Sequence, residues 1–173
     1  MTALDANRAK AQVANKCNLE ISDIKKMTIW GNHSPTMYPD LDNAEIKGES
    51  ASGWINDQNW IESDFLKIVQ QRGKAIIDAR GASSATSAAN AAIDTVKATL
   101  SETSADDWFS AAVLSDGSYD VPEGLIFGFP LKADTNGKIS IVQDLPISDY
   151  AQGKIDLTTK ELLDERSDIQ DLL

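Results

Sequence analysis

The chain has 173 residues, which is the size of a single domain. Its 27 acidic and 16 basic residues give a formal net charge of −11, which excludes a general binder of nucleic acid or of anionic lipid headgroups. Apolar residues make up 42% and charged residues 25% of the chain, as in a globular domain that buries a core. A single cysteine, Cys17, excludes an intrachain disulfide, and any chemistry that needs an imidazole must use the single histidine, His33.

The N-terminal part of the chain predicts a helix followed by short strands and turns. Residues 4–18 are rich in Ala, Lys, Arg and Gln, which favour a helix, and Thr2 is a candidate cap. The next expected elements are a helical turn at Ser22-Asp23, a strand over 27–30, a turn-rich loop over 31–35 and a weak hairpin around Gly48.

The middle of the chain predicts two long helices. Apolar residues recur near the helical spacing over 56–80, and Gly73 within this stretch indicates a close packing contact. The second helix is expected to run from an N-cap at Ser83 or Ser84 to about Leu100.

The last third of the chain predicts antiparallel strands and a final helix. Expected here are strands over 108–114, 125–132 and 138–142, a hairpin at Asn136-Gly137, and a helix from Ser148 or Asp149 towards Leu173. Pro130 indicates an edge strand or a bulge. Helices grouped together and followed by antiparallel strands predict an α+β fold, with long helices packed on an antiparallel sheet.

Several familiar ligand motifs do not occur in the sequence. The helix start at Gly81-Ala82-Ser83-Ser84 lacks the spacing of a nucleotide-binding glycine motif. One cysteine and one histidine cannot form a zinc site by themselves, so we expect no metal. The acidic residues near the C-terminus, among them Glu161 and Glu165, alternate with basic ones, which is typical of a solvated helix face. The sequence also has no membrane-length apolar segment and no signal-peptide pattern, and we therefore expect a cytoplasmic protein without a membrane partner.

Three residues stand out as candidates for chemistry. Asp5 and Arg8 are three positions apart on the first predicted helix, so their side chains share one face. Spacing alone favours a surface ion pair of little energetic value. His33 lies in a loop directly after a short apolar strand, where functional sites are often built.

These residues belong to runs that together resemble one enzyme family. The runs are Leu4-Asp5-Ala6-Asn7-Arg8-Ala9, Ile29-Trp30-Gly31-Asn32-His33-Ser34, Val69-Gln70-Gln71-Arg72-Gly73, Arg80-Gly81-Ala82-Ser83-Ser84-Ala85, Val121-Pro122-Glu123-Gly124, and Leu157-Thr158 to Leu163. They closely resemble the malate dehydrogenases of the cytosolic and bacterial branch of the lactate/malate dehydrogenase family. Two departures from the usual pattern are Ala3, where the family commonly has Arg, and Asp120, where it commonly has Gly.

The resemblance covers only the C-terminal, substrate-binding half of the family. It implies that residues 1–173 are this domain, and nothing in the sequence corresponds to the N-terminal dinucleotide-binding domain. It further implies that His33 is the general base and Asp5 its partner, and that Arg8 binds the substrate carboxylate. Ser83 and Ser84 would border the substrate and the nicotinamide, and Asn32 is a further substrate-binding candidate.

The implied reaction is the reversible oxidation of L-malate to oxaloacetate with NAD. Imidazole suits proton transfer because its reference pKa of about 6.5 is near neutral. We expect the chain alone to bind no NAD and to be inactive without its NAD-binding half, and the family implies a homo-oligomer, namely a dimer. Two alternatives stay open: half of a related 2-hydroxyacid dehydrogenase such as lactate dehydrogenase, or a non-enzymatic domain that keeps the fold for association with itself or with a partner.

Overall fold

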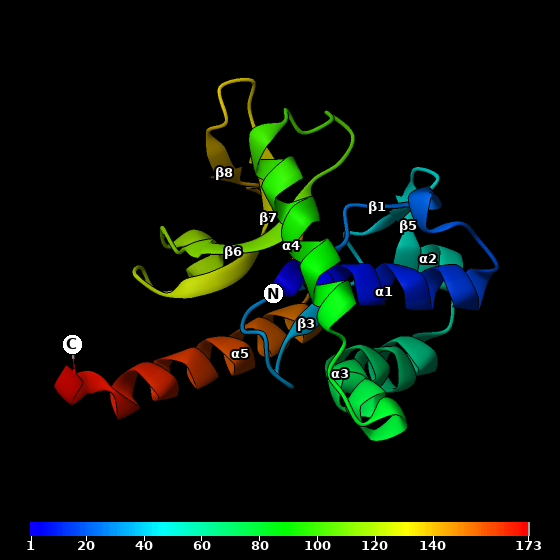
Figure 1. Cartoon of the computed structure of the whole chain (residues 1–173). Helices are drawn as coiled ribbons and strands as arrows, with labels where there is room; N and C mark the ends of the chain where they lie inside the picture. Colours follow the sequence, from blue (N-terminus) through cyan, green and yellow to red (C-terminus); the bar gives the residue numbers. More distant parts are fainter. Residues whose placement is uncertain (173) are drawn as a thin grey trace.

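The computed structural model describes residues 1–172 and shows an α+β fold of helices packed against small antiparallel sheets (Figure 1). The α-helices are α1 (Thr2–Cys17), α2 (Ala51–Ile55), α3 (Leu66–Arg80), α4 (Ala85–Leu100) and α5 (Asp149–Asp168). The strands are β1 (Ile24–Lys25), β2 (Thr28–Trp30), β3 (Tyr38–Asp40), β4 (Glu45–Ile46), β5 (Glu49–Ser50), β6 (Phe109–Leu114), β7 (Ile126–Ala133) and β8 (Ile139–Ile141). Short helical turns η1 (Ile21–Asp23), η3 (Ser118–Asp120) and η4 (Gln170–Leu172) and a π-helical segment, η2 (Trp60–Phe65), complete the described chain.

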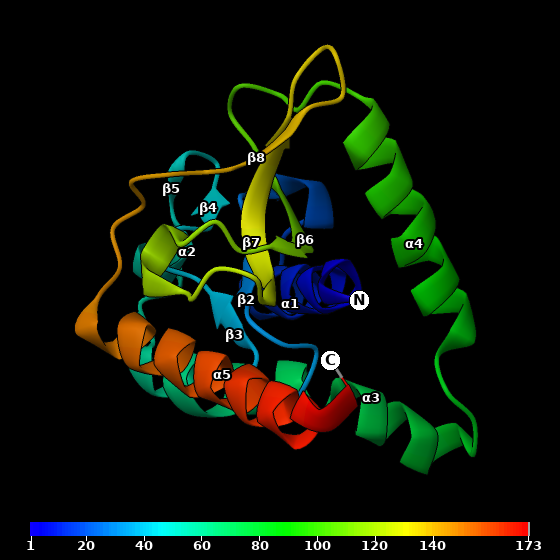
Figure 2. The same ribbon diagram turned by 90° about the vertical axis from the view of Figure 1, so that its left-hand side faces the viewer.

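The strands form three antiparallel sheets, ordered β1-β4-β5, β2-β3 and β6-β7-β8. Strand β2 pairs Trp30 with Tyr38 of β3, and a bridge between Gly31 and Gly128 joins the end of β2 to β7. Figure 2 shows α5 running beneath the β7 sheet, while α4 stands to one side of it. The β2 end therefore lies where the sheets meet, close to α1 and α5.

Two apolar clusters hold strand β2 from opposite sides. Successive strand residues face opposite sides, so Ile29 packs in a cluster with α1 and α3, and Trp30 packs in a cluster with β7 and α5. Trp30 is fully buried, and its indole nitrogen donates a hydrogen bond to the buried Asp40. Residues 31–36, which we call the His33 loop, thus begin from an anchored strand.

Most of the predicted elements are confirmed, with shifts of a few residues at their ends. The weak hairpin at Gly48 is the β4–β5 pair, and its two turn residues, Lys47 and Gly48, have φ of 52° and 89°, as a tight hairpin requires. Ser148 caps α5 by accepting the backbone N–H of Ala151 at 3.2 Å. The hairpin at Gly137 is the β7–β8 connection.

Three predictions about local structure need correction. Thr2 lies inside α1, because Met1 occupies the N-cap position. The helix predicted over 56–80 begins near residue 58 and contains the π-helical segment η2, while α2 was not predicted. Pro130 lies in β7, the central strand of its sheet, where the prediction placed an edge or a bulge. The Pro130 carbonyl accepts the backbone N–H of Val142, just beyond β8. The nitrogen and the carbonyl of one strand residue face the same neighbouring strand, so the missing N–H of Pro130 faces the end of the β8 pairing. The pairing with β6 stays intact.

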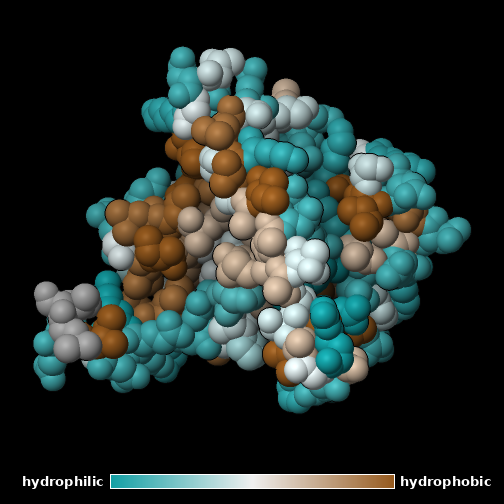
Figure 3. Space-filling model, in the orientation of Figure 1, coloured by the Kyte–Doolittle hydropathy of each residue, from teal (hydrophilic) through white to brown (hydrophobic). Residues whose placement is uncertain are grey.

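The surface carries apolar residues that the described chain leaves uncovered. On α4 these are Ile93, Val96 and Leu100, and on the β6–β7 pair they are Leu114 and Ile126. Figure 3 shows apolar surface gathered over the β6–β7 region. Within residues 1–172, no helix combines the length and the apolar character that crossing a bilayer requires.

Candidate active site

Helix α1 contributes a buried carboxylate and a guanidinium. The Asp5 side chain is 0% exposed, and its Oδ1 accepts a hydrogen bond from Nη1 of Arg8 at 3.1 Å. The Arg8 side chain is itself only 12% exposed. The helical spacing of the two residues was predicted correctly, but a surface ion pair was the wrong interpretation, because packing removes both groups from water.

The His33 loop brings the imidazole onto the second oxygen of the same carboxylate. Nδ1 of His33 lies 2.6 Å from Oδ2 of Asp5, and the histidine side chain remains 41% exposed. An ionised carboxylate can only accept hydrogen bonds, so with Asp5 ionised this contact places the proton of the neutral imidazole on Nδ1. Nε2, on the far side of the ring, is then free to accept a proton from another molecule.

Opposing influences act on the Asp5 carboxyl. Burial raises its pKa, and the neighbouring His33 and Arg8 partly offset this rise, so the pKa stays above its usual value. Two donors, one at each oxygen, nevertheless satisfy the ionised form. Asp5 therefore joins the imidazole and the guanidinium into one rigid unit.

A cavity of about 400 Å³ opens in front of Arg8 and His33. Ser83 and Ser84 lie on its wall, and Oγ of Ser84 accepts a hydrogen bond from Nη2 of Arg8 at 3.2 Å. A Cβ on Gly73 would lie 3.7 Å from both terminal nitrogens of Arg8, so the helix passes beside the guanidinium, but at an ordinary van der Waals distance and without the close contact predicted for this glycine. The cavity wall also includes Met1, Leu4, Ser34, Pro35, Met37, Gln70, Lys74, Ile77, Ala85 and Ala88.

The structure gives Asn32 a different environment from the other predicted site residues. Its side-chain amide donates to Glu161 at 3.1 Å and to Glu165 at 2.9 Å, both on α5, and among the described residues it is not part of the cavity wall. Its role as a substrate contact stays a prediction. Glu161, which the charge pattern assigned to a solvated face, is half-buried and contacts the His33 loop. Its spacing from Thr158, three residues earlier, is the one signal that both side chains share a helix face.

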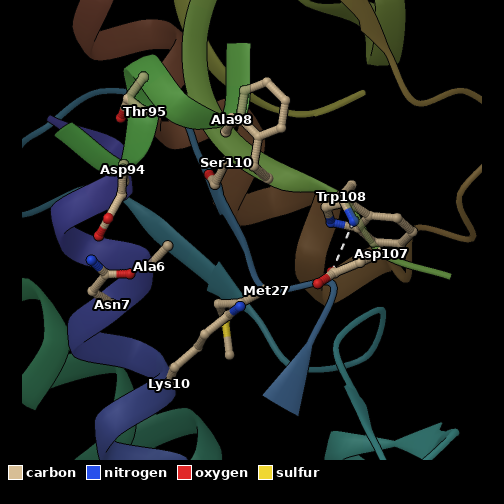
Figure 4. Close-up of a pocket in the computed structure, with 12 residues that line it drawn as sticks. Ala6, Asn7, Lys10, Met27, Asp94, Thr95, Ala98, Asp107, Trp108 and Ser110 are labelled. Carbon is tan, nitrogen blue, oxygen red and sulfur yellow. Dashed lines mark hydrogen bonds between the residues drawn. The ribbon is translucent and has the colours of Figure 1, made fainter. Parts of the chain in front are cut away.

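A second cavity, of about 290 Å³, lies between α1, α4 and β6 (Figure 4). Lys10 lines it, and burial lowers the pKa of this lysine while Asp107 opposes the effect. Asp94 adds a second carboxylate. This cavity contains no paired base and carboxylate comparable to His33 and Asp5, and the described residues hold no cluster of three or more metal-ligating side chains. The cavity at His33 is therefore the candidate active site.

The fold and this site together define the class of protein. Residues 2–172 match the family model of the lactate/malate dehydrogenase alpha/beta C-terminal domain, and the chain belongs to this family. Within the family the chain is 52% identical to a malate dehydrogenase of Cutibacterium acnes, over 99% of the chain and 52% of that relative.

Solved structures of both branches of the family share the fold. A malate dehydrogenase from Naegleria fowleri is 43% identical, with a TM-score of 0.93 over 100% of this chain and 52% of its own. A Trichomonas vaginalis lactate dehydrogenase, solved with NADH and oxamate, is 31% identical, with a TM-score of 0.91 over 99% of this chain and 53% of its own. The chain spans about half the length of these relatives.

Proposed function

We propose that residues 1–173 form the substrate-binding half of an NAD-dependent L-malate dehydrogenase, which interconverts L-malate and oxaloacetate. The observation that carries the proposal is the buried Asp5 carboxylate, which holds His33 at one oxygen and Arg8 at the other. A base and a carboxylate-binding group on one cavity fit a 2-hydroxy acid, which presents a hydroxyl beside a carboxylate. The relationship to malate dehydrogenases supports the same reaction.

His33 would handle the proton of the substrate hydroxyl. Oxidation of the alcohol removes this proton, and Nε2 accepts it while Nδ1 keeps its hydrogen bond to Asp5. The carboxylate then faces an imidazolium and stabilises its positive charge. In the reverse direction the imidazolium returns the proton to the carbonyl oxygen.

Arg8 would orient the substrate carboxylate. A guanidinium has five N–H donors in a planar fork, and the hydrogen bonds to Asp5 and Ser84 occupy two of them. The remaining donors can bind a carboxylate in two-pronged fashion, which fixes the plane of the substrate relative to His33. Ser83 and Ser84 on the cavity wall would border the bound molecule.

The nucleotide part of NAD does not fit the described residues. A dinucleotide site uses parallel strands and a glycine-rich turn that places pyrophosphate at a helix N-terminus, whereas all strand pairs within residues 1–172 are antiparallel. When bound, NAD supplies the acceptor for the hydride. We therefore propose that a nucleotide-binding domain completes the site, as the length of the relatives suggests. The exposed apolar side chains of α4 suit a contact with such a domain or with a second copy, and the dimer and the cytoplasmic location stay predictions.

A chimera tests the reaction. The NAD-binding part of the Cutibacterium acnes relative would be joined to Met1, and NADH formation would be followed with L-malate and with L-lactate. We expect efficient oxidation of L-malate, which would show that residues 1–173 supply a working substrate-binding half. Discrimination against L-lactate would be attributed to the added part, because it comes from a malate dehydrogenase. Preference for L-lactate would instead support the related 2-hydroxyacid dehydrogenase, a candidate that the likeness to the Trichomonas vaginalis enzyme favours.

The isolated chain provides the matching control. Calorimetry with NAD should show no binding, and L-malate oxidation should be restored only when the separately expressed NAD-binding part is added. Micromolar NAD binding by the isolated chain would refute the division into two halves. A chimera without turnover on either substrate, together with self-association of the chain in ultracentrifugation, would favour a non-enzymatic domain.

A further inference from the structure

Three side chains of the His33 loop converge on one carboxylate oxygen of α5. Oε2 of Glu161 lies 2.6 Å from Oγ1 of Thr36 and 3.1 Å from Nδ2 of Asn32, and the Ser34 hydroxyl also donates to it. The residues on either side of His33 in the sequence, Asn32 and Ser34, are thus both tied to the same helix.

Thr158, one turn earlier on α5, completes the contact. Its Oγ1 accepts the backbone N–H of Asn32 at 2.9 Å and lies 2.9 Å from the hydroxyl of Thr36. The threonine fits because Gly31 has no side chain: a Cβ there would lie 2.1 Å from Cγ2 of Thr158. Glycine also tolerates the φ of 90° at this position. Helix α5 therefore binds the loop through both backbone and side chains.

The Glu161 carboxylate can accept from each of the three donors that the His33 loop directs at it. The Ser34 hydroxyl donates to Glu161, the Thr36 hydroxyl is placed to donate to Glu161 or to Oγ1 of Thr158, and the Ser34 oxygen accepts the N–H of Thr36 at 3.0 Å. A carboxylate is an acceptor-only group and makes stronger, charge-assisted bonds. Burial raises the pKa of Glu161, but the bonds from Ser34, Thr36 and Asn32 outweigh this and lower it overall.

The His33 imidazole depends on this support because a large part of the ring is exposed and one hydrogen bond holds it. Within the described residues, its hydrogen bond is the one to Asp5, and the side chain is 41% exposed. Packing around the ring therefore restricts it little, and the backbone of the loop decides whether Nδ1 meets Oδ2. Arg8 is held differently, by Asp5 and Ser84, and touches neither Glu161 nor Thr158 in the described hydrogen bonds.

We propose that Glu161 is a positioning residue, which holds the His33 loop so that the imidazole stays hydrogen-bonded to Asp5. Its effect on the His33–Asp5 contact is independent of the reaction. Its effect on turnover rests on the function proposed above. The two effects can be measured separately, so failure of one proposal does not conceal failure of the other.

Nuclear magnetic resonance of the 173-residue chain tests the contact directly, since His33 is the only histidine. The low-field Nδ1–H proton and the Nδ1 nitrogen shift of His33 report its hydrogen bond to Asp5. We expect Glu161→Ala to broaden or abolish this proton signal, and Glu161→Gln to weaken it. Asp164→Asn removes the same charge from the same helix, where Asp164 pairs with Lys160, and should leave the signal unchanged.

A second readout separates positioning from general loss of structure. In the chimera, Glu161→Ala should lower kcat by about 10- to 100-fold, since small misplacements of catalytic groups have effects of this size. KM for the dicarboxylate should change less than about twofold, because Arg8 keeps its partners. An unchanged Nδ1–H signal or a wild-type kcat in Glu161→Ala would overturn the proposal. If that variant fails to fold, as judged by circular dichroism, the same criteria apply to Glu161→Gln.

Discussion

Asp5 on α1 and Glu161 on α5 are two carboxylates on opposite sides of the His33 loop, and their pKa values move in opposite directions. Asp5 is fully buried, and burial raises its pKa despite the contacts with His33 and Arg8. Glu161 is half-buried, and its hydrogen bonds from the loop outweigh burial and lower its pKa. The fold therefore disfavours ionisation of the carboxyl at Asp5 and favours it at Glu161.

The difference follows from how much water each carboxylate keeps. Asp5 is fully buried, and the loss of water around its carboxylate outweighs the attraction of the Arg8 guanidinium and the His33 imidazole. Glu161 accepts from neutral hydroxyl and amide groups at the rim of the protein, where water still reaches it. The carboxylate that loses its water and the carboxylate that keeps part of it thus lie on different helices, α1 and α5.

The largest effect should come from replacing His33, whose side chain Asp5 contacts and whose loop Glu161 contacts. His33→Asn in the chimera should lower turnover by about 10²- to 10⁴-fold, the usual contribution of a general acid–base group. The fold should persist, because the side chain is partly exposed. Steady-state kinetics and thermal unfolding measure the two quantities, and near wild-type turnover would remove His33 from the mechanism.

On the α5 side, Gly31→Ala should destabilise the protein by roughly 2–4 kcal/mol, combining left-handed backbone strain with overpacking. The new Cβ would overlap Thr158, and the residue has a φ of 90°. Urea unfolding of the chain measures the change. If the free energy of unfolding fell by less than an ordinary surface substitution causes, α5 would be able to move away from the loop at little energetic cost.

On the α1 side, Arg8→Lys should lower kcat/KM for the dicarboxylate by about 10- to 100-fold, the value of one or two charge-assisted hydrogen bonds. Lysine keeps the charge but cannot bond Asp5, Ser84 and a carboxylate through one planar group. NAD affinity of the chimera should change little, which provides the internal control. Unchanged kinetics would mean that Arg8 has only a structural role.

The two carboxylates should also give stability differences of opposite sign as pH changes. The folded state raises the pKa of Asp5, so its contribution is most favourable near or below pH 3.8 and declines as pH rises through the folded pKa. The folded state lowers the pKa of Glu161, so its contribution is present above pH 4.5 and is lost as pH falls through the folded pKa.

Unfolding free energies at several pH values check this sign reversal. Between acid and neutral pH, Asp5→Asn should gain stability relative to the parent chain, and Glu161→Gln should lose it. We expect a pH-dependent loss of about 0.5–1.5 kcal/mol for Glu161→Gln, at the low end for charged hydrogen bonds because water screens the group. Parallel slopes for the two variants would remove the contrast between the carboxylates.

The sequence predicted the surroundings of Asp5 better than those of Glu161. Asp5 and Arg8 share a helix face by spacing, and family resemblance placed them with His33, 28 residues from Asp5. Glu161 lies 127 residues from Ser34, and its neighbours alternate in charge, so local pattern predicted a solvated face. Contacts of this range depend on how α5 packs under the sheet, which no local periodicity encodes. The central position of Pro130 was missed for the same reason, since strand order is a tertiary property.

The smallest expected effect comes from a comparison of glycine substitutions on α3 and α5. Gly73→Ala on α3 should stabilise the chain by about 0.5–1 kcal/mol, the helix-propensity difference between the two residues. Its Cβ would lie 3.7 Å from both terminal nitrogens of Arg8, which is ordinary van der Waals contact.

Gly153→Ala on α5 is the matched control, because no described atom lies within 4 Å of the new Cβ. Both variants would be measured by thermal unfolding under the same conditions, and the difference between them gives the energy of the contact with Arg8. A stabilised Gly153→Ala beside a destabilised Gly73→Ala would show that the guanidinium needs the space at residue 73, and that the α1 side of the site is packed as tightly as Gly31 makes the α5 side.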